Sequence, residues 1–240
     1  MNVFKSISLL LIIFFLSCKT KNSEQNDTGV TAIKSNANET TADLNDLSPA
    51  EAIAYKNGVE KFKDINKLSF TFNVDRGDNH YERSWIWYPK RNQVTMQSNE
   101  DTLTFKRNTL DDVSRKADAA FINDSYWLLA PYHFVWDKGV EISQPLRAVA
   151  PISKDSLNKI SLTYVGDGGY TPGDAYDFYY DDDFMIKEWI FRQKNQEEPS
   201  MMTTWEDYKT VEGMNISTMH QDNTGEFKLY FTNIKATKGA

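Results

Sequence analysis

Large apolar residues recur at alternate positions in several segments after about residue 65. Phe70, Phe72 and Val74 are separated by single polar residues, which is the pattern of a strand with one buried face. A turn sequence at 75–78 follows, so we expect a hairpin. One face of its second strand carries Tyr81, Arg83, Trp85 and Trp87.

The remaining pattern predicts two helices and more short strands. Ser48 to Glu51 combine an N-cap, a proline at the first helical position and a capping-box glutamate, which predicts a helix over about 49–64. Thr109 and the two aspartates after Leu110 predict a second helix that ends near 121. Further strands are expected at about 93–98, 102–107, 159–165, 174–181, 184–192, 203–210, 214–220 and 226–234.

About ten antiparallel strands with these helices predict an α+β domain. The segments 85–88, 176–180 and 185–191 carry large apolar side chains on both faces, so their sheet needs cover on both faces or encloses a cavity. The run Tyr126–Trp136 is the most apolar one after the amino terminus, and Pro131 interrupts it. It is too short to span a bilayer, and we expect it to fold as two short buried pieces.

The amino terminus has the organisation of a secretory signal. Lys5 precedes a ten-residue apolar run at 7–16, about half of the roughly 20 residues that a transmembrane helix needs. Phe15-Leu16-Ser17-Cys18 resembles a bacterial lipobox, in which the cysteine becomes the acylated first residue of the mature protein. We therefore expect a lipoprotein signal peptide at 1–17 and lipidation of Cys18. The alternative is a stray cysteine beside an ordinary cleavage site.

Residues 19–47 contain no aromatic side chain and are rich in Asn, Thr, Asp, Ser, Glu and Lys. Such a segment buries too little apolar area to offset its chain entropy. We expect the lipidated Cys18 and a disordered tether to occupy 18–47, followed by a single domain at 48–240.

Charge and motif content exclude several classes of protein. The formal charge of −7 gives no counterion-release contribution to nucleic-acid binding, and a single cysteine excludes an internal disulfide framework and a Cys-based metal site. No nucleophile-elbow motif occurs, and the three histidines are far apart. The aspartates between 167 and 183 lack EF-hand spacing, so turn and strand roles are favoured over calcium binding. We expect no enzyme activity, no metal and no cofactor.

Aromatic motifs occur at 121–137 (FINDSYWLLAPYHFVWD), 168–177 (GGYTPGDAYD) and 204–208 (TWEDY), with Glu188-Trp189 before the last. They resemble an uncharacterised family of Bacteroidota lipoproteins that is similar in fold to the lipoprotein carriers LolA and LolB. The resemblance covers about 50–235. It implies an incomplete antiparallel β-barrel around an apolar cavity, with helices over the open side and acyl chains as the usual cargo.

The same resemblance implies which residues face the ligand. LolA-like carriers use an arginine within an early strand, and Arg83 is the nearest candidate. The run Tyr126–Trp136 would be the lid. The expected cavity and lid residues are Phe70, Phe72, Arg83, Trp85, Trp87, Trp127, Leu128, Phe134, Trp136, Tyr176, Phe178, Trp189 and Trp205.

These observations favour a non-enzymatic lipoprotein on the periplasmic side or outer-membrane surface of the cell envelope. It would bind an acyl chain or another hydrophobic small molecule, as a lipid or lipoprotein carrier or chaperone. Its lipid anchor would make the membrane a partner. Two alternatives stay open: a surface lipoprotein that binds carbohydrate through exposed aromatics, and a non-catalytic envelope scaffold. An enclosed apolar cavity would favour lipid binding. An exposed strip of aromatic side chains would favour carbohydrate binding, and an interior filled by side chains would favour a scaffold.

Overall fold

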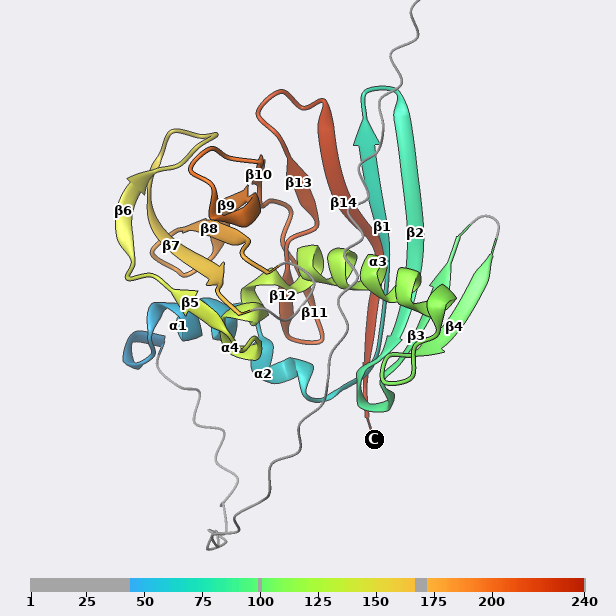
Figure 1. The fold of residues 1–240 in the computed structure, drawn as a ribbon. Coiled ribbons are helices and arrows are strands. Elements are labelled where there is room, and N and C mark those ends of the chain that lie inside the picture. The colour runs from blue at the N-terminus through green and yellow to red at the C-terminus, as the bar shows by residue number, and fades with distance from the viewer. Residues whose placement is uncertain (1–43, 99–100, 167–171, 240) are drawn as a thin grey trace, which may run out of the picture. The chain divides into compact units, whose positions relative to one another are not determined.

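The computed structural model (Figure 1) describes residues 44–98, 101–166 and 172–239. All of them belong to one compact unit, Thr41–Ala240. The predicted signal peptide, Cys18 and nearly all of the predicted tether lie outside the described residues. The division into 1–17, 18–47 and 48–240 therefore stays a prediction.

Six antiparallel strands form the first sheet, in the order β13-β14-β1-β2-β3-β4. At its centre is the predicted hairpin, in which Phe70 pairs with Trp85 and Leu68 with Trp87. Paired residues share a face, so these four side chains all point inward. The strands are β1 (Ile65–Arg76), β2 (Asn79–Tyr88), β3 (Gln93–Gln97), β4 (Thr102–Lys106), β13 (Met219–Gln221) and β14 (Phe227–Lys238).

The second sheet also has six strands, ordered β10-β9-β8-β7-β5, with β6 paired to β7 as well. β8 is buried on both faces, because a small outer cluster of Ala150, Tyr179 and Ile190 covers the side away from the main core. The strands are β5 (Val140–Ile142), β6 (Leu146–Val149), β7 (Ser156–Tyr164), β8 (Ala175–Tyr180), β9 (Ile186–Arg192) and β10 (Met201–Thr204). A separate pair contains β11 (Lys209–Val211) and β12 (Met214–Ile216).

The two large sheets join along one seam. Trp205, directly after β10, donates its backbone N–H to the Lys187 carbonyl at 2.7 Å, and Glu206 pairs with Met219 of β13. At the opposite ends, no pairing among the described residues joins β4 to β5 or β6. The result is the predicted α+β fold with an incomplete antiparallel barrel. The described residues form fourteen strands rather than about ten. β5 and β6 are too short to show alternation, and each of the predicted strands 203–210 and 214–220 is divided into two short strands.

The first predicted helix is broken in two. α1 (Pro49–Lys56) has the expected capping box, in which Ser48 Oγ accepts from the Glu51 N–H, but α2 (Val59–Phe62) is separate. Gly58 between them has φ +86°, and a Cβ at this position would lie 2.3 Å from the Gly213 carbonyl oxygen. The expected continuous helix over 49–64 is therefore wrong, because the chain turns at Gly58 where the β11–β12 turn approaches it.

α3 (Asp112–Leu129) is longer than predicted. Its N-cap is Asp111 rather than Thr109, with Asp111 Oδ1 accepting from the Ser114 N–H at 2.8 Å. The predicted end near 121 is wrong, because the Asp124 side chain bonds to β2 instead of competing for the helix backbone. The helix ends before Pro131, and the 3₁₀ helix η3 (Ala130–Tyr132) and α4 (His133–Trp136) follow. The expectation that 126–136 folds as two short buried pieces is wrong for the first half, because residues 126–129 continue α3, and Val135 and Trp136 at its end are exposed.

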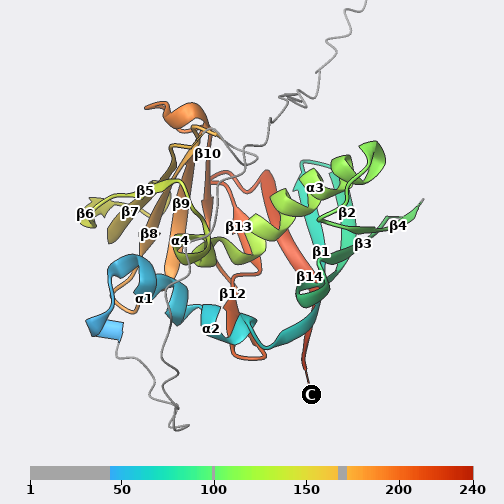
Figure 2. The same cartoon turned by 60° about the horizontal axis from the view of Figure 1, so that its bottom comes forward.

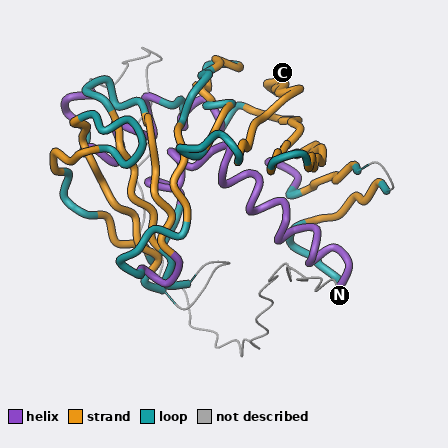
Figure 3. Tube along the Cα trace, turned by 90° about the horizontal axis from the view of Figure 1, so that it is seen from above, coloured by secondary structure: helices purple, strands orange, loops and turns teal. Residues whose placement is uncertain are grey.

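Helix α3 covers the inner side of the incomplete barrel. In Figures 1 and 2 it runs from the β3–β4 end of the first sheet toward the second sheet, and Figure 3 shows it from above between the strands of the two sheets. Within the described part of the chain, no helix has the length and apolar character that a membrane span needs. The other 3₁₀ helices are η1 (Leu44–Asp46), η2 (Pro89–Arg91) and η4 (Gln193–Asn195).

Candidate functional site

Most of the predicted cavity and lid residues meet in one hydrophobic core. Only Arg83, Trp87 and Trp136 are less than nine-tenths buried. The others are Phe70, Phe72, Trp85, Trp127, Leu128, Phe134, Tyr176, Phe178, Trp189 and Trp205. Strands of both sheets, α3 and α4 therefore contribute to a single interior.

Aromatic rings of α3 occupy the space between the two sheets. Phe121 lies edge-on to Trp85 and Trp87, with ring centroids 5.4 and 5.2 Å apart. Trp127, almost two turns later, lies 4.3 Å from Trp189 of the second sheet. These separations are typical of favourable aromatic packing. At these rings the helix and both sheets are in direct contact, so side chains fill this part of the interior.

Trp136 lies at the edge of this core. It is 38% exposed, and its ring packs against Phe62 and Tyr132 with centroids 4.9 and 5.0 Å apart. The Tyr132 hydroxyl in turn donates to the Asn57 carbonyl at 2.8 Å. The end of the predicted lid is thus held by the first two helices, and Trp136 lies beside α2 rather than within the core.

Arg83 points into the half-barrel, where it meets a buried carboxylate of α3. Its Nε and Nη2 donate to the two oxygens of Asp124 at 2.5 and 2.6 Å, and the Trp85 indole donates to Asp124 Oδ2 at 2.8 Å. The Asp124 side chain has no exposed area and that of Arg83 is 17% exposed. Burial acts to lower the pKa of Arg83, but Asp124 outweighs it and raises that pKa. This bidentate pair holds the middle of α3 on β2.

A second ion pair fastens α3 to the first sheet nearer the start of the helix. Arg107, directly after β4, places Nε 2.6 Å from Asp118 Oδ1, and its guanidinium lies 5.2 Å from the Phe121 ring centroid. Asp118, Phe121 and Asp124 are spaced by three residues, so they share one face of the helix. The inward face of α3 is therefore mixed, with an aromatic ring between two carboxylates that each meet an arginine.

A buried histidine lies among the aromatic rings at the seam. His220 of β13 has no exposed area, and its ring centroid is 4.4 Å from that of Trp205 and 5.4 Å from that of Trp127. Burial lowers the pKa of His220 to about 3, against smaller opposing effects of the Thr204 and Ser217 carbonyls. The ring is therefore neutral at pH 7.

A polar chain ties the segment after α4 to the second sheet. His133 Nδ1 lies 2.8 Å from Asp137 Oδ2, and the Tyr164 hydroxyl of β7 donates to the same oxygen. Burial acts to raise the pKa of Asp137, but the hydrogen bonds to His133 and Tyr164 outweigh it and hold that pKa below its ordinary value. An ionised carboxylate thus links the lid to β7.

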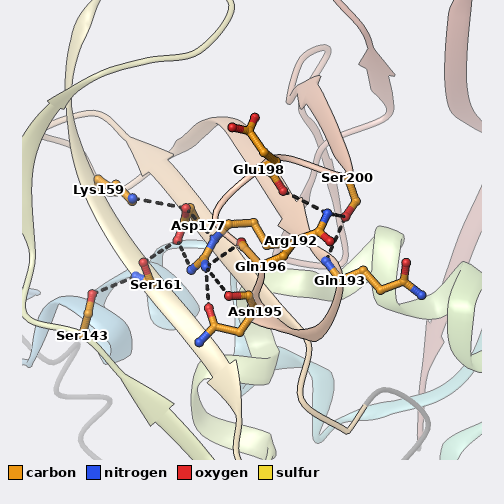
Figure 4. A network of polar contacts seen from close by, with 10 residues as sticks. All are labelled: Ser143, Lys159, Ser161, Asp177, Arg192, Gln193, Asn195, Gln196, Glu198 and Ser200. Carbon is orange, nitrogen blue, oxygen red and sulfur yellow. Dashed lines mark hydrogen bonds and ion pairs between the residues drawn. The ribbon is translucent and has the colours of Figure 1, made fainter.

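A separate polar network lies on the outer side of the second sheet (Figure 4). Asp177 of β8 accepts hydrogen bonds from Ser161 and Arg192, and Lys159 Nζ lies 3.1 Å from its Oδ2. Burial opposes ionisation of Asp177, yet these neighbours hold its pKa below the ordinary value. Within the described residues, no group of His, Cys, Asp and Glu side chains could hold a metal ion. Asp167 lies outside them. Asp177 thus joins its own strand β8 to the two neighbouring strands, β7 and β9, that supply its partners.

The sequence interpretation did not find three polar residues of the interior, Asp124, Thr203 and His220. For Asp124 a signal existed, since its spacing from Phe121 and Asp118 places it on the inward helix face. Thr203 and His220 carry no such signal. They reach the same interior only because β10 and β13 meet at the seam.

No family model matches the chain, and no curated protein matches it. Among solved structures it is similar to a LolA superfamily protein from Nitrosomonas europaea, with 13% identity, 80% of this chain and 94% of that one covered, and a TM-score of 0.47. It is also similar to a DUF1329 family protein from Desulfovibrio piger (11% identity, 81% and 95% covered, TM-score 0.43). A domain from Vibrio parahaemolyticus named for outer-membrane lipoprotein sorting gives 8% identity, 80% and 94% coverage and a TM-score of 0.42. These likenesses are loose, and the fold described above rests on this chain's own strand order.

Proposed function

We propose that the protein is a lipid-anchored, non-enzymatic carrier of the cell envelope that takes up an acyl chain or a similar apolar ligand against the inner face of its two sheets. The observation that carries this proposal is the way α3 covers that face. The helix buries aromatic rings of both sheets, yet two ion pairs hold it on the first sheet. The anchor would be the acylated Cys18.

In this proposal the ligand takes the place of α3. Phe121 and Trp127 occupy positions against Trp85 and Trp189 that an acyl chain would fill. A chain of about sixteen carbons gains roughly 0.8 kcal/mol for each buried CH₂, on the order of 12 kcal/mol before association costs. That gain is large enough to offset the parting of a buried ion pair, which costs about 3–5 kcal/mol when one partner is lost.

The two ion pairs favour reversible detachment of α3 from the first sheet. When α3 has left and no ligand yet covers the inner face, Arg83 and Arg107 regain water together with their carboxylate partners, so hydration offsets much of the lost attraction. Purely apolar contacts would expose their area without such compensation. The mixed inward face of α3 therefore favours reversible opening.

The alternatives differ in what supports them. Trp85, Trp189 and Trp205 are at most 2% exposed, so they offer no surface platforms for carbohydrate. One specific observation supports the scaffold alternative: the aromatic rings of the interior contact one another directly, so side chains fill that space. A scaffold is therefore the second candidate, and ligand binding separates it from the carrier.

The test uses the chain from residue 18 onward with Cys18→Ser, so that no attached acyl chain competes. A carrier is expected to bind the neutral fluorescent probe N-phenyl-1-naphthylamine saturably and to release it when hexadecanoic acid is added. If no saturable binding occurs at any probe concentration, the carrier proposal fails and the scaffold takes its place.

A variant of α3 tests its part as the cover. Asp124→Asn keeps the shape of the side chain but weakens the link to Arg83, so probe association is expected to become faster and affinity tighter, because less free energy is needed to part α3 from β2. The matched control is Asp177→Asn, which changes another buried carboxylate with an arginine partner on the outer side of the second sheet. It is expected to lower stability without changing the association rate. Equal kinetic effects of both variants would contradict the cover.

A further inference from the structure

Four buried polar atoms at the seam have no hydrogen-bond partner among the described residues. They are Trp189 Nε1, Trp205 Nε1, Thr203 Oγ1 and His220 Nε2. All four residues are at most 2% exposed. Since a buried polar group without a partner costs folding free energy, four of them in one place indicate an occupant that supplies the missing hydrogen bonds.

These side chains share the inner face of the seam. β10 pairs with β9 so that Thr203 lies opposite Trp189, which places both side chains on one face. Trp205 is two residues farther along and faces the same interior. Its ring centroid is 5.6 Å from that of Trp189 and 4.4 Å from that of His220. We call these four residues the seam cluster.

The seam cluster offers neutral hydrogen-bonding groups of both kinds. An indole N–H can only donate, whereas a threonine hydroxyl can donate or accept. His220 Nδ1 faces the Thr204 carbonyl oxygen at 3.3 Å. It must donate there, so Nε2 of the neutral ring is an acceptor. The cluster therefore presents two donors, one acceptor and one hydroxyl that can take either part.

We propose that the seam cluster binds the uncharged, oxygen-bearing head of the apolar ligand, which is an ester carbonyl or an undissociated carboxylic acid. An ester carbonyl accepts from the indoles, and an undissociated acid also donates its O–H to His220 Nε2. A carboxylate is disfavoured, because a buried anion needs a cation and the cluster is neutral. The inference rests on the proposed function and names the ligand class for the same interior.

Helix α3 controls access to the seam cluster as well as to the aromatic face. The Trp127 ring lies 4.3 Å from Trp189 and 5.4 Å from His220, so it covers the cluster in this state. The movement of α3 that admits an acyl chain would also uncover these polar atoms. The head would then bind at the seam, with its chain along the inner face.

The test compares ligands that differ only in their head. Methyl dodecanoate and tridecane each displace N-phenyl-1-naphthylamine from the chain that begins at Cys18→Ser. Thr203→Val and Trp205→Phe each remove one hydrogen-bonding group, so they are expected to weaken methyl dodecanoate about three- to ten-fold and tridecane by less than about two-fold. Trp127→Phe is the matched control, because it makes the same ring change beside the cluster and is expected to alter both affinities by one factor.

Dodecanoic acid adds a pH readout. Its undissociated fraction falls about ten-fold per pH unit between pH 6 and 8, since carboxylic acids titrate well below this range. Its affinity is expected to fall in proportion, while that of methyl dodecanoate stays constant. An acid affinity that does not change with pH would show that the carboxylate binds, which overturns the proposal of an uncharged head.

Stability without ligand gives an independent readout. Thr203→Val removes a buried hydroxyl that has no partner at little change in volume, so the melting temperature is expected to rise by about 2 °C or more. The same change at Thr71 is expected to lower it, because Thr71 Oγ1 lies 2.7 Å from Ser84 Oγ and the residue is also buried. A Thr203 variant that is more stable and binds the ester more weakly has the signature of a binding residue rather than a packing residue.

Two results separate the failure of this inference from the failure of the carrier proposal. If Thr203→Val and Trp205→Phe change both affinities by the same factor, the cluster does not recognise the head, and the carrier proposal stands without it. If no probe binds saturably while Thr203→Val raises the melting temperature, the Thr203 hydroxyl is a buried polar group that binds no ligand, and both proposals fail.

Discussion

Arg83 of β2 and Asp124 of α3 form a bidentate ion pair inside the half-barrel, with Nε and Nη2 of the arginine 2.5 and 2.6 Å from the two carboxylate oxygens. They are 41 residues apart in the sequence. The pair joins the central hairpin of the first sheet to the helix that covers its inner face. With the Arg107–Asp118 pair, it places charged contacts on both sides of Phe121 on the inward face of α3.

Replacing one partner of this pair is expected to cost more stability than replacing both. Arg83→Met leaves the Asp124 carboxylate buried without its cation, which is expected to lower the free energy of unfolding by about 3–5 kcal/mol. Adding Asp124→Leu removes the stranded charge and is expected to restore most of that loss. Urea denaturation of the wild type, both single variants and the double variant measures the coupling. A double variant less stable than Arg83→Met would contradict this account.

Gly58 is expected to tolerate no side chain. Gly58→Ala forces a Cβ to within 2.3 Å of the Gly213 carbonyl oxygen at φ +86°, so we expect a loss of at least about 2 kcal/mol in the free energy of unfolding. Gly77→Ala is the matched control, because Gly77 also has positive φ, +54°, but nothing lies within 4 Å of its added Cβ. It is expected to lose only about 1 kcal/mol from backbone strain. Equal melting temperatures for the two variants would show that Gly213 does not restrict this turn.

His220 is expected to make the protein less stable as pH falls from 7 to 5. Burial lowers its pKa to about 3 in the folded protein, from the ordinary value of 6.5. Between these two values the unfolded chain binds a proton that the folded protein does not, so the free energy of unfolding falls with decreasing pH, by up to about 1.4 kcal/mol per unit. Urea denaturation at pH 7, 6 and 5 is expected to show a shallower dependence for His220→Phe.

The matched control for this pH dependence is His80. Its hydrogen bond to Asp75 is the main cause that raises the pKa of this exposed histidine, so its contribution has the opposite sign and is lost as pH rises. His80→Gln is expected to steepen the loss of stability toward pH 5. An unchanged pH dependence in His220→Phe would mean that the ring is solvated or protonated in the folded protein.

Cys18→Ser is expected to abolish labelling by a radioactive fatty acid and to move the protein from the membrane fraction to the soluble fraction. The reason is that the apolar run before Cys18 is too short to span a bilayer, so the acyl chains would supply the anchor. Fractionation of cells that express either form measures the outcome. A Cys18→Ser protein that remains membrane-bound and labelled would rule out this anchor.

The sequence by itself predicted the elements that depend only on residues close to one another in the sequence. The capping box at Ser48 needs only the residues up to Glu51, and the β1–β2 hairpin follows from alternation on both sides of one turn. Arg83, Trp85 and Trp87 were placed on one strand face for the same reason. Short-range periodicity and capping are properties of a few consecutive residues, so they can be read from the chain directly.

Only the tertiary structure decided the features that join distant residues. Gly58 breaks the first helix because Gly213 approaches it. Helix α3 continues through Asp124 because Arg83 of the first sheet donates to the Asp124 carboxylate, which then does not compete for the helix backbone. Trp205 and His220 come together because β10 and β13 meet at the seam. In each case the deciding free energy comes from packing, burial and hydrogen bonds between segments that no local pattern connects, and these override the local preferences of the chain.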